Sequence, residues 1–299
     1  MEDKKRLIII DSNSLLHRAF HALPPLTAKT GEQTGAVYGF LLILFKAIKD
    51  LQASYVVACF DTKSPTFRHE KFSDYKAHRP TTPNEILLQF PKIKEILEKL
   101  KIPIFAKEGF EADDLIATIN TMAKNQSDKL EIYILSGDLD NLQLVDEITK
   151  VYTLGKGIKD TVIYNEDRVI TRFGVKPLQM IDFKALAGDP ADNISGVPGI
   201  GKKTAAELIK KFDSVKNLYN EMSQGMANIK PRIKDLLIDN KKTALLSLEL
   251  VEMKKDVNID FLLENCKFGK FNLKEVEDKL KSFDFNTLIN RLPLLLNHK

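Results

Sequence analysis

The sequence predicts an α/β domain with a central, mainly parallel sheet, followed by a domain made only of helices. In the first half of the 299-residue chain, short apolar runs typical of strands alternate with longer segments of helical periodicity, which is the pattern of βαβ units. After about Thr171 the strand pattern disappears and only helical segments follow. A chain of this length is long for one domain and comfortable for two. We therefore expect domains at 1–170 and 171–299.

The individual elements follow from apolar spacing and from the residues that flank each run. In the first domain we expect strands at 7–10, 55–60, 131–136 and 150–154, and helices at 14–21, 34–51, 84–101 and from Glu111 onward. In the second domain the expected helices are 176–187, 202–212 and 231–253, with short pieces from 273 to 292.

One segment of the first domain, 62–83, fits neither a strand nor an amphipathic helix. From Thr62 to Arg79 it holds five basic residues against two acidic ones, interleaved with aromatic residues. It has no clean apolar face, so we do not expect it in the core. Because the segment leaves the predicted sheet after Asp61 and returns at Pro83, we expect it to arch over the edge of the sheet.

The composition is that of an ordinary globular protein, with a net charge of +4 and two cysteines. Cys59 lies inside an apolar strand pattern, where a thiol packs as a small hydrophobe, so neither a disulfide framework nor a zinc site is indicated. The N-terminus lacks the apolar core of a signal peptide, and the uncharged stretch 34–45 is too short to span a bilayer. We expect a cytoplasmic protein without a membrane partner.

Carboxylates gather where the predicted strands end. In an open α/β sheet the carboxyl ends of the strands converge on one crevice, so residues distant in sequence can be pooled there. Many anions share a small volume only if cations join them, and hard divalent ions such as Mg²⁺ or Mn²⁺ prefer oxygen ligands. We therefore predict two such ions, the arrangement used for phosphodiester hydrolysis. The nine candidate ligands are Asp11, Asp61, Glu111, Asp113, Asp114, Asp138, Asp140, Asp189 and Asp192.

A single Asp after a strand has a simpler role, because its side chain commonly caps the next helix. Asp11 and Asp140 each fit that role well. Capping, however, needs one carboxylate per helix, whereas several of these clusters carry two or three within four residues. The weakest members of the metal set are Asp114 and Asp189, which could instead be caps or supports for other ligands.

A glycine-rich turn, GVPGIGKKTA at 196–205, is the informative motif of the second domain. Its glycines let the backbone approach a ligand closely, and the helix after Gly201 offers free N–H groups to a phosphate. The turn is not a nucleotide-binding loop of the Gly-x-x-x-x-Gly-Lys-Ser/Thr type, because Lys203 stands where Ser or Thr is required. It therefore favours a DNA backbone over ATP.

Together these motifs closely resemble the 5′ nuclease domain of bacterial DNA polymerase I, within the flap endonuclease family. The resemblance covers nearly the whole chain and implies a PIN/resolvase-like sheet, a helical arch at 62–83 and a helix-hairpin-helix in the second domain. It is carried, in order, by Asp11, Phe60-Asp61, YKAHRP at 75–80, EADD at 111–114, SGDLD at 136–140, GDPADN at 188–193 and the glycine-rich turn. The closing FDFNTLINRLP at 283–293 also matches the end of that domain.

The resemblance implies a structure-specific endonuclease and 5′-3′ exonuclease acting in replication and repair. It implies that Asp61, Glu111 and Asp113 hold the first metal, with Asp11 binding through water. The second metal would be held by Asp114, Asp138, Asp140, Asp189 and Asp192.

The same resemblance assigns roles outside the metal set. Lys76 and Arg79 match a basic pair beside the scissile phosphate, Tyr75 matches an aromatic residue that stacks on a base, and Arg18 matches a DNA contact. The glycine-rich turn would hold the duplex, and there the family often binds a monovalent cation such as K⁺. The residues of the turn that would contact DNA are Gly199, Gly201, Lys202, Lys203 and Thr204. The histidines at 17, 21, 69 and 78 are expected to pack or to contact phosphate rather than act as bases.

The implied partners are DNA with 5′ flaps, nicks or RNA primers, at the bacterial nucleoid, and a DNA polymerase domain in the same or another chain. Two alternatives to the nuclease remain. A DNA-binding scaffold without activity would keep the basic segments but has no need of nine carboxylates. A PIN-type ribonuclease would share the acidic crevice but would lack the arch and the glycine-rich turn.

Overall fold

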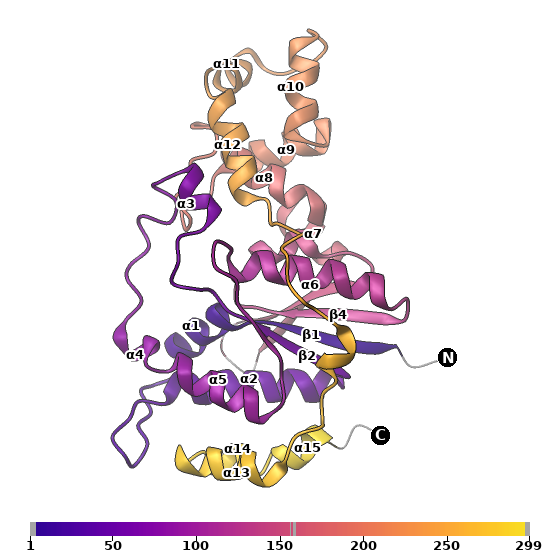
Figure 1. Ribbon diagram of the computed structural model, residues 1–299. Coiled ribbons are helices and arrows are strands. Elements are labelled where there is room, and N and C mark those ends of the chain that lie inside the picture. The colour runs from indigo at the N-terminus through magenta and orange to yellow at the C-terminus, as the bar shows by residue number, and fades with distance from the viewer. Residues whose placement is uncertain (1–3, 156, 158–159, 297–299) are drawn as a thin grey trace.

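A six-stranded sheet lies at the centre of the computed structural model, which describes residues 4–155, 157 and 160–296 (Figure 1). The strand order is β3-β2-β1-β4-β5-β6, and every neighbouring pair is parallel except β5 and β6. The predicted mainly parallel sheet is therefore confirmed. The strands are β1 (Lys5–Asp11), β2 (Tyr55–Cys59), β3 (Ile104–Phe105), β4 (Leu130–Leu135), β5 (Thr149–Leu154) and β6 (Thr161–Tyr164).

The sheet is buried on both faces, as parallel sheets are. Alternate residues of β1 enter opposite cores: Leu7 and Ile9 pack in the core that includes α6, and Ile8 and Ile10 in the core that includes α1, α2 and α5. All four side chains are fully buried. Burial on both faces explains why the sequence of each central strand is a continuous apolar run. The helices are α1 (Ser12–Ala22), α2 (Gly35–Leu51), α5 (Phe90–Lys99) and α6 (Ala112–Gln126).

Two predicted helices are each divided in the structure. The helix expected at 84–101 forms α4 (Asn84–Leu87) and α5, because Pro91 at the start of α5 has no N–H to continue the hydrogen-bond ladder. The helix expected at 231–253 forms α11 (Pro231–Asp239) and α12 (Lys241–Val251). Between them, Asn240 leaves the helical conformation and its side chain donates to the carbonyl of Leu236 at 2.9 Å.

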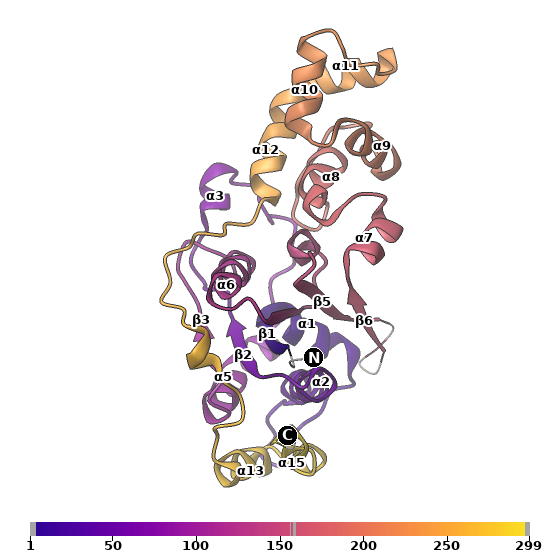
Figure 2. The same cartoon turned by 90° about the vertical axis from the view of Figure 1, so that its right-hand side faces the viewer.

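The second half is helical, as predicted. It contains α7 (Glu166–Phe173), α8 (Met180–Ala187), α9 (Lys202–Phe212), α10 (Val215–Ser223), α11 and α12, which Figures 1 and 2 show together at one end of the molecule. The chain then returns along the sheet, so that α13 (Leu273–Ser282), α14 (Asn286–Ile289) and α15 (Leu292–Leu296) lie at the opposite end, against α2 and α5. The division near residue 170 stays a prediction. No helix in 4–155 or 160–296 is long and apolar enough to cross a bilayer.

Residues 62–83 run outside the sheet from α3 (Phe67–Lys71) down to α4 (Figure 1). The middle of the segment is anchored on the loop that follows α8. The backbone N–H of Lys76 donates to the carbonyl of Asp192 at 3.0 Å, and the side chain of Asn193 donates to the carbonyl of Asp74 at 2.7 Å. The segment is therefore fixed beside the end of the sheet where the carboxylates lie.

Candidate metal centre

The carboxyl ends of the strands border a crevice of about 530 Å³. Asp11 ends β1, Asp61 follows β2, and Asp138 follows β4, so the parallel topology alone brings these three together. The start of α6 adds two more carboxylates. The five that line the crevice are Asp11, Asp61, Glu111, Asp113 and Asp138, and Arg18, Lys76 and Arg79 line it with them.

Asp11 is also the N-cap of α1, so capping and a place in the crevice are compatible. Asp11 accepts from the backbone of Ser14 at 3.1 Å and from the hydroxyl of Ser136 at 2.6 Å. Asp61 accepts from the backbone of Ala112, the first residue of α6, at 2.7 Å. These hydrogen bonds fix both carboxylates at the crevice wall.

A second carboxylate group lies beside the first. Asp140, Asp189 and Asp192 bring ligand oxygens within 4.8 Å of one another, a spacing that could hold one metal ion. Asp140 begins a short 3₁₀ helix, η1 (Asp140–Leu144), whereas the other two lie in the loop after α8. This group therefore joins the sheet to the helical half.

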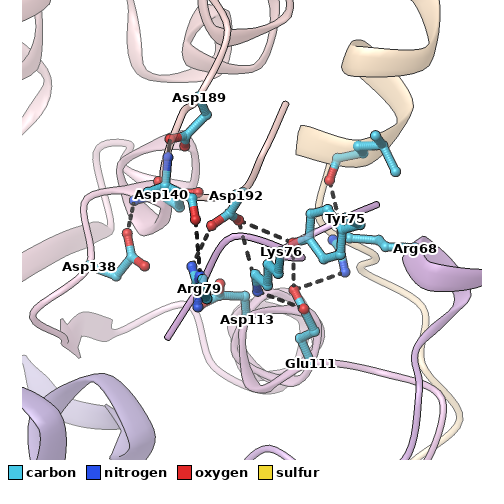
Figure 3. A network of polar contacts seen from close by, with 12 residues as sticks. Arg68, Tyr75, Lys76, Arg79, Glu111, Asp113, Asp138, Asp140, Asp189 and Asp192 are labelled. Atoms are coloured by element: carbon cyan, nitrogen blue, oxygen red, sulfur yellow. Dashed lines mark hydrogen bonds and ion pairs between the residues drawn. The ribbon is translucent and has the colours of Figure 1, made fainter. Parts of the chain in front are cut away.

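Three cations of the protein are inserted among these carboxylates, and two of them, Lys76 and Arg79, are labelled in Figure 3. Lys76 Nζ lies 2.6 Å from Glu111 Oε1, and Arg79 pairs with Asp192. Lys184, on α8, pairs with Asp140 and lies 2.7 Å from Asp189 Oδ2. Each of the two carboxylate groups therefore includes at least one protein cation.

The electrostatics of the cluster follow from burial and crowding. Burial, followed by the neighbouring carboxylate of Asp138, raises the pKa of Asp140 to about 7. Burial also raises the pKa of Asp11 to about 7 and that of Asp113 well above its usual range, with further contributions from neighbouring carboxylates. Asp192 behaves differently, because Lys76 and Arg79 outweigh its burial and lower its pKa. An all-oxygen donor set that resists full ionisation fits hard divalent cations, which would neutralise it.

Asp114 lies outside both groups. It is fully buried and accepts four hydrogen bonds: two from the Arg68 guanidinium at 2.7 and 2.9 Å, and one each from the backbones of Glu111 and Lys254 at 3.1 and 2.8 Å. These contacts use the four acceptor positions that a carboxylate offers. The geometry does not support the predicted role of Asp114 as a metal ligand.

Tyr75 is also placed differently from the expectation. Its side chain is 3% exposed and belongs to the core beside α6. Its hydroxyl lies 3.1 Å from both Glu111 Oε2 and Asp192 Oδ2, so it links the start of α6 to the loop after α8. A buried ring is not available to stack on a base in this conformation.

The predicted DNA contacts occupy two separate places. Arg18 lies at the crevice, where it donates to the carbonyl of Gly155 at 2.7 Å. The glycine-rich turn lies instead at the start of α9. Gly199 has φ +87°, a conformation that favours glycine, and Gly201 caps the helix. Lys202 and Lys203 are exposed on the first turn, and Thr204 is partly buried beside them.

Sequence reasoning missed four residues of the site: Arg68, Ser136, Asn141 and Lys184. Lys184 gave one usable signal, because it is a cation within the otherwise mostly apolar segment MIDFKALA. Arg68 was counted only as one member of a basic segment. Ser136 and Asn141 gave no signal of their own, since a neutral polar residue beside a carboxylate is common in any loop.

Two family models match adjoining parts of the chain, from residue 6 to residue 274. A family model described as the N-terminal resolvase-like domain of 5′-3′ exonuclease matches residues 6–174. A second model, described as the C-terminal SAM fold of 5′-3′ exonuclease, matches residues 175–274.

Among similar proteins, a 5′-3′ exonuclease of Aquifex aeolicus is 37% identical over 288 residues, which are 96% of this chain and 95% of that protein. DNA polymerase I of Bacillus subtilis is 39% identical over 98% of this chain, but the match spans only 33% of the polymerase. The chain thus spans about a third of the length of such polymerase relatives. A solved T5 D15 flap endonuclease complex with DNA and metal ions has a TM-score of 0.66 at 20% identity, and the match covers 98% of this chain and 99% of that one. This likeness establishes the fold.

Proposed function

The chain belongs to the 5′-3′ exonuclease family of nucleases, and we propose that it hydrolyses phosphodiesters at 5′ flaps and 5′ ends of DNA with two Mg²⁺ ions. The observation that carries this proposal is the pooling of carboxylates from β1, β2, β4, α6 and the loop after α8 at one end of the sheet. Basic residues on the rim of the same crevice suit a polyanionic substrate.

The ligand sets are those that the family resemblance implies, without Asp114, and they take Asp138 from the crevice wall together with the second carboxylate group. Asp61, Glu111 and Asp113 would hold one ion, with Asp11 binding through water. Asp138, Asp140, Asp189 and Asp192 would hold the other. When bound, the ions polarise the phosphoryl group and supply hydroxide from bound water.

The cations of the site would act on the substrate. Lys76 and Arg79 line the crevice, and Arg79 remains partly open to solvent, with 45% of its side chain exposed. A phosphate entering the crevice would offer both residues a new anionic partner. Arg18, which also lines the crevice, would add a further contact.

The helical half would hold duplex DNA away from the chemistry. Lys202 and Lys203 are exposed at the start of α9, where backbone N–H groups are also free to bind phosphate. We include K⁺ at this turn in the proposal. A polymerase domain, in the same or another chain, is the proposed partner, because the matching region of Bacillus subtilis DNA polymerase I is part of a longer protein.

A 5′-flap oligonucleotide tests the proposal. We expect cleavage near the junction of single strand and duplex in Mg²⁺. Cleavage in excess EDTA would contradict the metal-dependent proposal. Tight duplex binding without cleavage would favour the scaffold alternative, and cleavage of single-stranded RNA alone would favour the PIN-type ribonuclease.

A further inference from the structure

The side chains of Asn141 and Ser136 connect two carboxylates that approach the crevice from different elements. Asn141 lies in η1 and is fully buried. Its Nδ2 donates to Asp113 Oδ1 at 3.1 Å and to Ser136 Oγ at 3.4 Å. Ser136 Oγ in turn donates to Asp11 Oδ2 at 2.6 Å. An unbroken series of hydrogen bonds therefore runs from Asp113 on α6 to Asp11 on β1.

The donors in this series are fully used. An amide nitrogen carries two N–H groups, and a serine hydroxyl carries one. The two N–H groups of Asn141 point to Asp113 and to Ser136, and the single O–H of Ser136 points to Asp11. The backbone N–H of Asp138 also donates to Ser136 Oγ at 2.9 Å, which holds the hydroxyl in place.

The acceptor of Asn141 is left without a partner. Its Oδ1 is buried and has no hydrogen bond within the described residues. An unsatisfied buried acceptor is destabilising, so this position is poorly suited to a residue that only fills space. Turning the amide over would bring Oδ1 against the carboxylate of Asp113, which disfavours that arrangement.

We propose that Asn141 and Ser136 are positioning residues that hold Asp113 and Asp11 in the orientation that binds a divalent ion. Neutral donors are suited to this task. Lys76, Arg79 and Lys184 also hold carboxylates, but their positive charge opposes a second cation at the same place. The amide and the hydroxyl fix the carboxylates without that repulsion. This inference rests on the proposed metal centre.

The test measures Mn²⁺ affinity in the absence of DNA, from the electron paramagnetic resonance signal of free Mn²⁺. We expect Asn141→Leu to weaken binding by about 10–100-fold, the usual effect of removing a group that orients a metal ligand. Ser136→Ala should weaken it as well, and the loss of binding free energy in the double variant should be smaller than the sum of the two single losses, because the two residues are hydrogen-bonded to each other. In the same variants, the single-turnover rate on flap DNA should recover at high Mg²⁺.

Gln143→Leu is the matched control. Gln143 is a buried amide in the same 3₁₀ helix, but it bonds backbone groups, those of Val251 and Met253 at 3.2 Å each and the carbonyl of Asp140 at 3.3 Å, and it makes no hydrogen bond to a carboxylate side chain within the described residues. It should lower thermal stability and leave Mn²⁺ affinity unchanged. If Asn141 had only a structural role, Asn141→Leu would behave like Gln143→Leu, with lower thermal stability and unchanged Mn²⁺ affinity.

The inference is overturned if Ser136→Ala and Asn141→Leu bind Mn²⁺ as the wild type does, or if Gln143→Leu weakens binding equally. Should Asn141→Leu fail to fold, Ser136→Ala decides alone, because it removes only a hydroxyl. A wild-type protein that binds no Mn²⁺ and cleaves no flap would instead contradict the proposed function.

Discussion

The guanidinium of Arg68 and the carboxylate of Asp114 form a two-pronged ion pair, with nitrogen–oxygen distances of 2.7 and 2.9 Å. Both side chains are almost completely buried. Arg68 also donates to the carbonyls of Leu250 and Glu252, at the end of α12, at 2.8 and 3.0 Å. The pair therefore ties three parts of the molecule together: the base of the 62–83 segment, the first turn of α6 and the helical half.

This geometry predicts that Asp114 and its neighbour Asp113 have different roles. Asp114→Asn should destabilise the protein by up to about 3–5 kcal/mol, because the buried charge of Arg68 loses its two-pronged partner and keeps the Glu111 carboxylate, 3.4 Å away. Its Mn²⁺ affinity should stay near that of the wild type. Asp113→Asn should instead keep the fold and lose metal affinity and turnover. Thermal unfolding and Mn²⁺ titration of both variants provide the test; a loss of metal affinity in folded Asp114→Asn would restore it to the ligand set.

Lys184 should act as an internal counter-ion of the second carboxylate group. Burial alone would lower its pKa, but Asp140 and Asp189 outweigh that effect and raise it. Lys184→Met should lower the melting temperature of the metal-free protein and increase the rise in melting temperature caused by Mg²⁺, because uncompensated carboxylates then gain more from the ion. Lys210→Met, at an exposed position of α9, is the control. An equal Mg²⁺ effect in wild type and Lys184→Met would contradict this role.

The raised pKa values predict how stability and metal binding depend on pH. Asp11 and Asp140 each have a folded pKa of about 7 against an ordinary value of 3.8. Between these values the folded state binds more protons than the unfolded state, so their contribution to stability falls as pH rises from about 4 to about 7. Divalent ions should restore stability above that range and release protons on binding. Melting curves with and without Mg²⁺ between pH 5 and 8 measure this. A metal effect that does not grow with pH would contradict it.

The glycine-rich turn should bind duplex DNA and take no part in the chemistry. Replacing Lys202 and Lys203 with Ala removes up to two phosphate contacts, so the slope of log K against log salt should shrink by up to about 0.9 per contact. Salt titrations in Ca²⁺, where hydrolysis should be slow, measure the slope. Lys270→Ala with Lys274→Ala, at exposed positions near the opposite end of the molecule, is the matched control. If the wild type, the Lys202/Lys203 variant and the control variant all show the same slope, the two lysines of the turn face solvent in the complex.

Lys76 should contribute more to the rate than to DNA affinity. Its Nζ lies among the carboxylates, 2.6 Å from Glu111 and 3.8 Å from Asp192, at the wall of the crevice. A preorganised donor beside the reacting phosphate is worth on the order of 10²–10³ in rate, whereas many other contacts hold the DNA. Single-turnover rates and dissociation constants for Lys76→Ala separate the two. A defect confined to affinity would reduce Lys76 to a substrate contact.

The sequence by itself determined the class of fold and the chemistry of the site. Continuous apolar runs such as Leu7 to Ile10 can be buried only in a sheet covered on both faces, and carboxylates placed directly after such strands must meet at one edge. Asp11, Asp61 and Asp138 follow three such parallel strands, so the sequence alone predicts that they lie together. The outer strands β3 and β6 are too short for their apolar pattern to stand out.

Only the tertiary structure decided which groups face each other within that pool. Asp113 and Asp114 are adjacent in sequence, yet consecutive residues of a helix point about 100° apart, so one enters the crevice and the other meets Arg68. Tyr75 and Lys184 come from segments far apart along the chain. Each contacts an aspartate of the loop after α8, so the way this loop packs on the sheet determines their partners. Hydrogen-bond partners of this kind depend on distances of a few tenths of an ångström, which local sequence patterns do not encode, whereas the periodicity of apolar residues is encoded in every element.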